Sequence, residues 1–286
     1  MRAHPLPALA LLLLASGPAS AVLVRDDVPD EAYRVDRADH PALVVLFEPD
    51  DCAATLIDPS HLLTVAHCAV DVPVGFAVSV AGEGRTVGAS VLHGRWRDRD
   101  DWDIAVLELD SPVSTVAPVP LYRGDDELGA TVALLGTGVT GTGLTGEEGG
   151  SSDGVLRRAT NVVTAVDDQV LTVRFDRPDE PGVTDLEGVG ASGDSGGPVL
   201  WDIDGTPTLV GLNAFGDEGN RGLVGEYGAL DHQTRVSRFV DWIDAVVAGE
   251  VPDEGRGCST VPTAPTTWAS MRWLARRRSA SDADSR

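Results

Sequence analysis

Short apolar runs bounded by turn-forming residues recur along most of this 286-residue chain. Such runs are typical of β-strands. They fall into two successive groups, separated by a Pro- and Val-rich segment at residues 112–120 that we interpret as a connection. The runs are 42–47, 52–57, 61–65, 76–80, 85–92 and 104–109 in the first group, and 131–135, 156–166, 170–175, 199–203, 208–215 and 228–236 in the second. Two groups of short strands predict an all-β protein built from barrels or sandwiches rather than a parallel sheet.

The two ends of the chain depart from this pattern. Arg2, an apolar run at 8–15 and small residues at 19–21 predict an export signal, after which the mature chain starts at Val22. The apolar run is much shorter than the roughly 20 residues that a membrane span needs, so we expect no span. Near the other end, apolar residues recur at helical spacing over 236–247, which predicts one closing helix.

These features divide the chain into three parts. We expect a signal peptide at 1–21, one secreted domain at 22–248 whose halves meet near 112–125, and a disordered tail at 249–286. The tail carries Cys258, an apolar stretch at 268–274 and an Arg cluster at 276–278. This order faintly resembles the C-terminal sorting tails of some Gram-negative surface proteins, so surface anchoring through the tail is a further hypothesis. The predicted location is extracellular or periplasmic.

The chain is strongly acidic. Its formal net charge is −23, and every basic residue is Arg because the sequence contains no Lys. A chain with this charge is repelled by phosphate backbones, so we expect no nucleic-acid partner. Clustered carboxylates at 98–103 or 125–127 could hold calcium, whereas runs of this kind are more often solvated faces. Both interpretations stay open.

Three cysteines in an exported chain suggest one disulfide and one leftover thiol. We expect Cys52 to pair with Cys68 and Cys258 to remain outside the pair. Closing a loop of this size should stabilise the fold by about 3 kcal/mol. No second Cys pair or His cluster has the spacing of zinc ligands, so no zinc site is expected, and apart from the calcium left open above we expect no metal or other cofactor.

The run Gly193-Asp194-Ser195-Gly196-Gly197-Pro198 has the composition of a nucleophile loop. Glycines on both sides of Ser195 leave no neighbouring Cβ atom to block an incoming carbonyl, and Gly193 can turn its N–H toward a developing oxyanion. The alternative is an inert hairpin. A serine hydroxyl is a weak nucleophile by itself, so the catalytic interpretation requires a base elsewhere in the chain.

Three further segments carry residues that bear on this question. His67 follows an apolar run and precedes Cys68, so the expected disulfide would fix its turn, although a solitary His is more often structural. Asp103 opens an apolar run and is either a solvated strand end or a carboxylate that orients an imidazole. Residues 136–141 match a dinucleotide-binding glycine pattern, but no helix follows, and we interpret 136–154 as a flexible surface loop.

Taken together, the segments 64–68 (TVAHC), 103–107 (DIAVL) and 193–198 (GDSGGP) resemble the three signatures of the trypsin/chymotrypsin family of serine proteases, in the same order. The resemblance implies two antiparallel six-stranded β-barrels, a C-terminal helix and an active site between the barrels. It implies that His67 is the general base, Asp103 its orienting partner and Ser195 the nucleophile, with the N–H groups of Gly193 and Ser195 forming the oxyanion hole. The substrates would be proteins or peptides.

The resemblance also bears on activation. In this family the carboxylate at the position of Asp194 pairs with a newly formed amino terminus. The usual activation sequence is missing here, but signal removal would expose the apolar residue Val22. We therefore expect an activating ion pair between Val22 and Asp194. The alternative is a further cleavage after Arg25, which would expose the charged residue Asp26.

The specificity pocket departs from the family pattern. Val189 stands at the pocket base, where trypsins carry Asp, and Asp231 stands where a pocket-wall Gly is usual, so its carboxylate could still attract a basic side chain. The segment expected to pair with substrate backbone consists of Asn213, Ala214, Phe215 and Gly216, with Ala and Phe in place of the usual Ser and Trp.

Two other functions remain open at this point. One is a catalytically silent relative that uses the fold as a binding module. The other is an esterase or processing enzyme of narrow specificity with the same triad.

Overall fold

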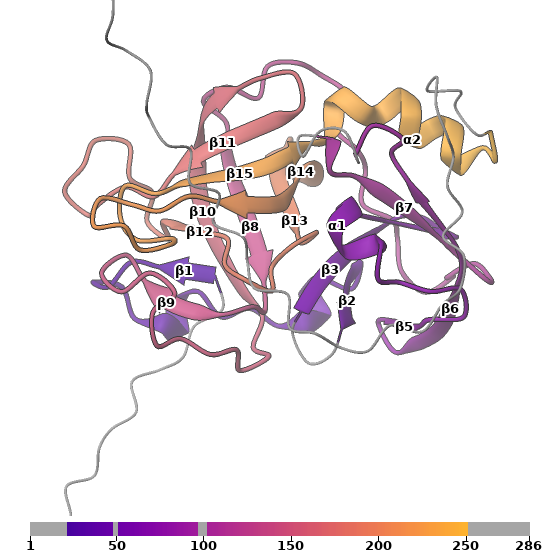
Figure 1. Cartoon of the computed structure of the whole chain (residues 1–286), viewed down its shortest axis with the longest axis horizontal. Coiled ribbons are helices and arrows are strands. Elements are labelled where there is room, and N and C mark those ends of the chain that lie inside the picture. The colour runs from indigo at the N-terminus through magenta and orange to yellow at the C-terminus, as the bar shows by residue number, and fades with distance from the viewer. Residues whose placement is uncertain (1–21, 48–50, 97–101, 251–286) are drawn as a thin grey trace, which may run out of the picture.

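The computed structural model of the chain describes residues 22–47, 51–96 and 102–250. Figure 1 shows two β-structures side by side, the earlier part of the chain in indigo to purple and the later part in pink to orange. The predicted signal peptide, Cys258 and the remainder of the predicted tail after residue 250 lie outside the described residues, as do positions 98–101 of one acidic run.

The first barrel is a six-stranded antiparallel sheet in the order β2-β3-β4-β7-β6-β5, whose outer strands β2 and β5 contact each other. Its strands are β2 (Leu43–Phe47), β3 (Asp51–Asp58), β4 (His61–Thr64), β5 (Ala77–Val80), β6 (Glu83–Leu92) and β7 (Ala105–Leu109). Four of the five residues in β7 are buried, as expected for a continuous apolar run at the centre of a barrel.

The second barrel is a closed antiparallel ring in the order β10-β11-β15-β14-β13-β8. Its strands are β8 (Thr131–Gly136), β10 (Arg157–Val166), β11 (Val170–Arg174), β13 (Pro198–Ile203), β14 (Thr206–Gly216) and β15 (Leu230–Arg235). Along the first part of β10, buried residues alternate with partly exposed ones, which is the period of a strand with one face in a core. The expected fold of two six-stranded barrels is therefore confirmed.

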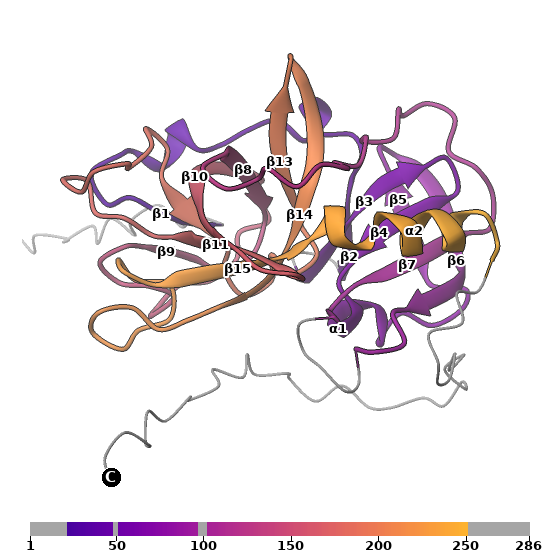
Figure 2. The ribbon, with the colours of Figure 1, turned by 90° about the horizontal axis from the view of Figure 1, so that it is seen from above.

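The closing helix joins the two halves. A 3₁₀ turn (Val236–Phe239) leads from the second barrel into α2 (Val240–Val247), which Figure 2 shows lying across the first barrel. Trp242, Ile243 and Val246 bury their side chains in the core of that barrel. The sequence predicted one helix over 236–247, and the structure forms its first turn as 3₁₀. No helix among the described residues is long and apolar enough to cross a membrane.

A third, small sheet was not predicted. It consists of β1 (Val22–Val24), which pairs in parallel with β9 (Thr140–Thr142) and antiparallel with β12 (Gly188–Val189). The prediction of a flexible surface loop over 136–154 was wrong for its first part, because Thr137 and Thr140 are buried and 140–142 forms β9. The described residues also form the short helices α1 (Ala66–Ala69), η1 (Asp30–Ala32) and η2 (Arg37–Asp39).

Candidate active site

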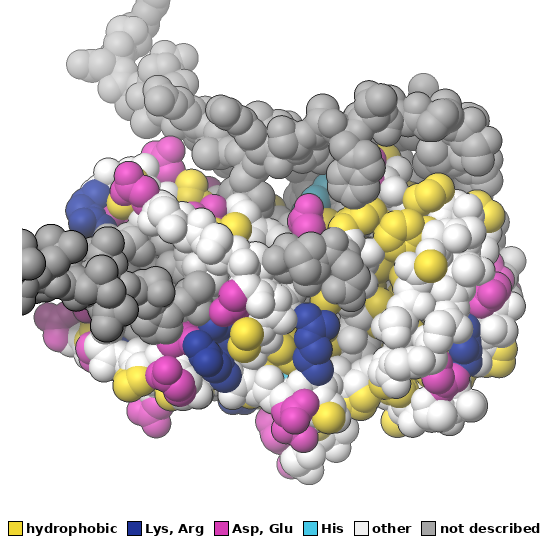
Figure 3. Space-filling model, turned by 90° about the horizontal axis from the view of Figure 1, so that it is seen from below, with side chains coloured by type: hydrophobic (Ala, Val, Ile, Leu, Met, Phe, Trp, Pro, Cys, Tyr) yellow, Lys and Arg dark blue, Asp and Glu magenta, His cyan; other side chains and the backbone are white. Residues whose placement is uncertain are grey.

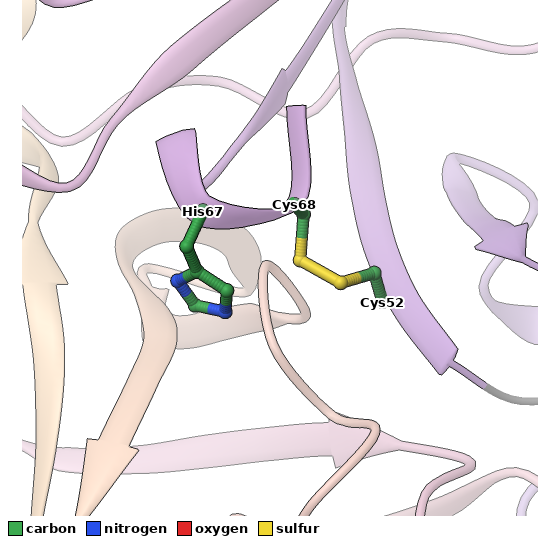
Figure 4. A group of neighbouring side chains, drawn as sticks. All are labelled: Cys52, His67 and Cys68. Carbon is green, nitrogen blue, oxygen red and sulfur yellow. A yellow bond between two sulfur atoms is a disulfide. The ribbon is translucent and has the colours of Figure 1, made fainter. Parts of the chain in front are cut away.

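His67 lies on α1, directly after β4 of the first barrel. The neighbouring Cys68 forms the expected disulfide with Cys52 of β3, with 6.0 Å between the two Cα atoms. Figure 4 shows the imidazole on one side of the short helix and the disulfide beside it. The disulfide therefore ties the turn that carries His67 to the adjacent strand.

The Asp103 carboxylate faces His67 with both oxygens. Its Oδ2 lies 2.5 Å from His67 Nδ1, and its Oδ1 accepts the backbone N–H of His67 at 2.8 Å. The Asp103 side chain is only 9% exposed. Its backbone carbonyl accepts the hydroxyl of Thr234 on β15 at 2.8 Å, which links this corner of the first barrel to the second. The two-point contact fixes the orientation of the imidazole.

The environment of His67 changes its proton affinity. Partial removal from water acts against the charged imidazolium, but the Asp103 carboxylate more than offsets this, with a smaller contribution from Asp51, and the pKa of His67 is raised above its usual value. A base with a raised pKa binds a proton more tightly. Only the neutral imidazole can accept a proton, and this form predominates at pH values above the pKa.

Ser195 lies in the turn that precedes β13, in the second barrel. Two strand residues of the first barrel hold this turn, since Cys52 N–H donates to Gly193 O at 2.9 Å and Ala53 N–H donates to Ser195 O at 2.7 Å. Cys68 Sγ lies 3.7 Å from the same Ser195 oxygen. Ser195 is therefore beside the turn that carries His67.

No hydrogen bond joins Ser195 Oγ to His67 among the residues that the structure describes. In an unliganded site this contact is often long and shortens when the substrate binds.

Two backbone donors beside Ser195 have no acceptor. Within the described ranges, neither the Gly193 N–H nor the Ser195 N–H donates a hydrogen bond to the protein. Gly193 adopts a φ of 96°, a conformation that favours glycine. Unpaired N–H groups next to a nucleophile can stabilise a developing oxyanion.

Asp194, the residue before Ser195, is buried. It accepts the N–H of Gly138 at 2.8 Å and that of Ala191 at 2.9 Å. Burial raises the pKa of Asp194 to about 7, although these hydrogen bonds act in the opposite direction. In the part of the chain that the structure describes, no cationic side chain pairs with it. A positive charge placed beside this buried carboxyl group would stabilise its ionised form.

A small pocket lies next to Ser195, lined by Gly190, Ala191, Ser195, Asn213, Ala214, Phe215 and Asp231. Asp231 is buried there, and its Oδ2 accepts the N–H of Gly190 at 2.9 Å and the Nε2–H of Gln233 at 3.0 Å. Burial raises the pKa of Asp231 to about 7. The ring of Phe215 stacks on His232 with 4.6 Å between centroids.

The remaining two residues expected in the pocket lie elsewhere. Val189 is buried in β12, where it pairs with Leu23 and packs in the second core, and it is absent from the pocket lining. Gly216, at the end of β14, pairs with Asp231 but does not line the pocket.

One residue of this region, Glu147, was not predicted from the sequence. The carboxylate of Glu147 accepts the N–H of Ser192 at 2.6 Å and the hydroxyl of Ser192 at 2.8 Å. Glu147 lies in the glycine-rich segment that we interpreted as a flexible loop, and nothing in its local sequence distinguishes it from the neighbouring Glu148.

Potential metal ligands in the described residues come together at Cys52, His67 and Cys68, whose ligand atoms lie within 4.8 Å of one another. The two sulfur atoms form the disulfide and are not available as thiolates. In the acidic run at 125–127, Glu127 is occupied by Arg235 and Ser237. The calcium hypothesis for this run stays untested.

Comparison with known proteins supports the resemblance seen in the motifs. Residues 31–243 match the family model described as Trypsin. A protein named trypsin from Saccharopolyspora erythraea is 30% identical over 217 residues, which cover 67% of this chain and 89% of that protein. Snake venom serine proteinase 14 from Crotalus adamanteus is 28% identical over 215 residues, which cover 69% of this chain and 78% of that protein.

Proposed function

Because the chain belongs to the trypsin family and is a serine-type peptidase, we propose that it is a secreted endopeptidase that cleaves peptide bonds through Ser195, His67 and Asp103. The observation that carries the proposal is the double contact of Asp103 with His67, in which Oδ2 lies 2.5 Å from Nδ1 while Oδ1 accepts the backbone N–H. A carboxylate in this position keeps the proton on Nδ1 and leaves Nε2 free to accept one.

The proposed reaction follows the family mechanism. The Ser195 hydroxyl attacks the substrate carbonyl while His67 takes its proton, and the carbonyl oxygen becomes an oxyanion that the N–H groups of Gly193 and Ser195 stabilise. His67 then returns the proton to the leaving amine, which breaks the peptide bond and leaves an acyl-enzyme. Water, activated by the same imidazole, releases the acyl group.

The charge of the pocket supports a preference for a basic side chain before the scissile bond, and the pocket, with a volume of about 10 Å³, would have to widen to admit one. Asp231 is the one carboxylate among the lining residues, and it is buried beside Ser195. Figure 3, a view of the molecule from below, shows more acidic than Arg side chains on its left half. Together with a net charge of −23, such a surface attracts cationic peptides.

We expect Asp231→Asn to lower kcat/KM for cleavage after Arg by about 30- to 3,000-fold, since truncating one partner of a buried charge pair costs roughly 2–5 kcal/mol. Cleavage after an uncharged residue should change little. Because burial raises the pKa of Asp231 to about 7, the wild-type ratio of Arg to uncharged cleavage should also rise with pH through this value.

A mixed peptide library with mass-spectrometric readout measures both effects. Asp168→Asn is the matched control, because Asp168 is an exposed carboxylate between β10 and β11 and does not line the pocket. Equal use of Arg and uncharged residues by the wild type would contradict the role of Asp231. Turnover of simple esters without cleavage of any peptide would instead favour the narrow esterase, and turnover of neither would favour the silent binding module.

We also propose that removal of residues 1–21 activates the enzyme through an ion pair between the new amino group of Val22 and Asp194. In support, Val22 is fully buried in β1 and pairs with Thr140, two residues from the Gly138 whose N–H contacts Asp194. The disulfide and the family are consistent with an extracellular location. The positive charge would lower the pKa of Asp194 and hold it as a carboxylate.

The active protein should therefore start at Val22. Acetylation of this amino group, introduced by semisynthesis, should lower kcat by about 100-fold or more, as does the loss of an oxyanion donor, while binding of a fold-specific antibody is kept. N-terminal sequencing tests the first point. A different terminus on the active protein, such as Asp26, would contradict the proposal.

A further inference from the structure

The peptide between Ser192 and Gly193 decides where one oxyanion donor points. Its carbonyl, Ser192 O, accepts the N–H of Val139 at 2.6 Å. In a planar trans peptide the carbonyl and the N–H point in opposite directions, so this bond turns the Gly193 N–H away from Val139 and leaves it unpaired. The donor is thus aimed by a contact on the far side of the same peptide.

One backbone hydrogen bond within the turn contributes to this orientation, because the Asp194 N–H donates to Ala191 O at 2.9 Å across Ser192 and Gly193. Gly193, with φ at 96°, has no Cβ to restrict rotation, and glycine populates several other conformations at little energetic expense. Ser192 is partly exposed, so no surrounding core holds it either. Contacts from outside the 191–195 turn therefore add to the restraint that the turn itself provides.

Glu147 supplies such a contact on the other side of Ser192. One carboxylate oxygen accepts the Ser192 N–H at 2.6 Å and the other accepts its hydroxyl at 2.8 Å. With Val139 bound to its carbonyl, Ser192 is held at both of its peptide units and at its side chain. Hydrogen bonds to a carboxylate are stronger than those between neutral groups.

The backbone that carries Glu147 is itself anchored. Its N–H donates to Val224 O at 3.1 Å, and the preceding Gly146 N–H donates to Thr142 O at 2.7 Å. A Cβ at Gly146 would lie 2.3 Å from Val224 O, so this close approach requires glycine. Contacts with β9 and the 217–227 loop therefore hold in place the segment that carries the Glu147 carboxylate.

We propose that Glu147 is a positioning residue that holds Ser192 so that the Gly193 N–H faces the carbonyl of the substrate. The proposal rests on the proposed peptidase function. The Gly193 N–H stabilises the negative charge that develops on the substrate's carbonyl oxygen in the transition state. Loss of the Glu147 carboxylate therefore lowers kcat while KM stays nearly constant.

The test compares Glu147→Ala, Glu147→Gln and the control Glu148→Ala, which removes an adjacent exposed carboxylate with no side-chain hydrogen bond in the described structure. Full-length mature protein is assayed for kcat and KM on a peptide amide, for the rate of labelling by a fluorophosphonate, and for amide hydrogen exchange at 191–195. Glu147→Ala should lower kcat and the labelling rate by up to about 100-fold and speed exchange at Ser192. Glu147→Gln, which keeps an acceptor for the N–H, should recover most of the activity, and Glu148→Ala should match the wild type.

Three results would overturn the inference. Unchanged kcat in a folded Glu147→Ala variant would show that the turn is held without this carboxylate, and the peptidase function would stand. Equal losses in the Ala and Gln variants, with a lowered melting temperature, would show a merely structural role. If the wild type is neither labelled nor active, the proposed function fails, and this inference fails with it.

Discussion

Replacing Ser195 with alanine is expected to lower kcat for peptide hydrolysis by about a millionfold, as removal of the catalytic serine does in enzymes with a Ser-His-Asp triad. The variant keeps the unpaired N–H groups of Gly193 and of the backbone at position 195, so a residual rate above that of water should remain. Its stability should be close to that of the wild type, since Ser195 Oγ makes no hydrogen bond among the described residues.

The measurement is steady-state kinetics on a peptide amide, with thermal melting as a check of folding. Ser111→Ala, at an exposed serine in the connection between the barrels, is the matched control and should retain full activity. Retention of more than about 1% of wild-type kcat by Ser195→Ala would mean that another group carries out the attack.

Asp103→Asn is expected to lower kcat by about 10⁴-fold near neutral pH while leaving the fold intact. The amide NH₂ of an asparagine would donate to His67 Nδ1, now 2.5 Å from Asp103 Oδ2, and would place the ring proton on Nε2. Nε2 could then no longer accept the proton of Ser195. The asparagine amide oxygen can still accept the backbone N–H of His67, and the backbone carbonyl of residue 103 can still accept the hydroxyl of Thr234.

The same substitution should lower the pKa of His67. The carboxylate of Asp103 raises this pKa, whereas the partial burial of the ring lowers it and would remain. NMR titration of the imidazole measures the change directly, with Asp110→Asn at the exposed end of β7 as the control. A His67 pKa that does not move, or a kcat within tenfold of the wild type, would contradict the assigned role of Asp103.

The strands of both barrels could be predicted because each combines apolar residues with clear turn signals. β7 and β10 agree with their predicted ranges to within about one residue. The sheet β12-β1-β9 could not be predicted, since its strands have only two or three residues each and form through pairing between distant segments. Periodicity needs a longer window than these strands provide.

The residues of the candidate site also differ in how far the sequence predicts them. His67, Asp103 and Ser195 could be selected as candidates because short motifs surround them, and the structure brings His67 and Asp103 together and places Ser195 beside the turn that carries His67. The residues that line the pocket depend on where each strand ends in three dimensions, which sequence patterns do not show. Val189 lies in the core of the second barrel, whereas Asp231 lines the pocket. Glu147 carries no motif, and its contact with Ser192 bridges 45 residues of sequence.

The most direct test of the account is to map the site of a fluorophosphonate adduct. Mature protein with a confirmed Val22 terminus is labelled above pH 7, where neutral His67 increases, and the modified peptide is sequenced by mass spectrometry. The account predicts one adduct, on Ser195, that is absent from Ser195→Ala and much slower to form in Asp103→Asn. An adduct on another serine, or no adduct on folded protein, would contradict the claim that Ser195, His67 and Asp103 form the catalytic centre.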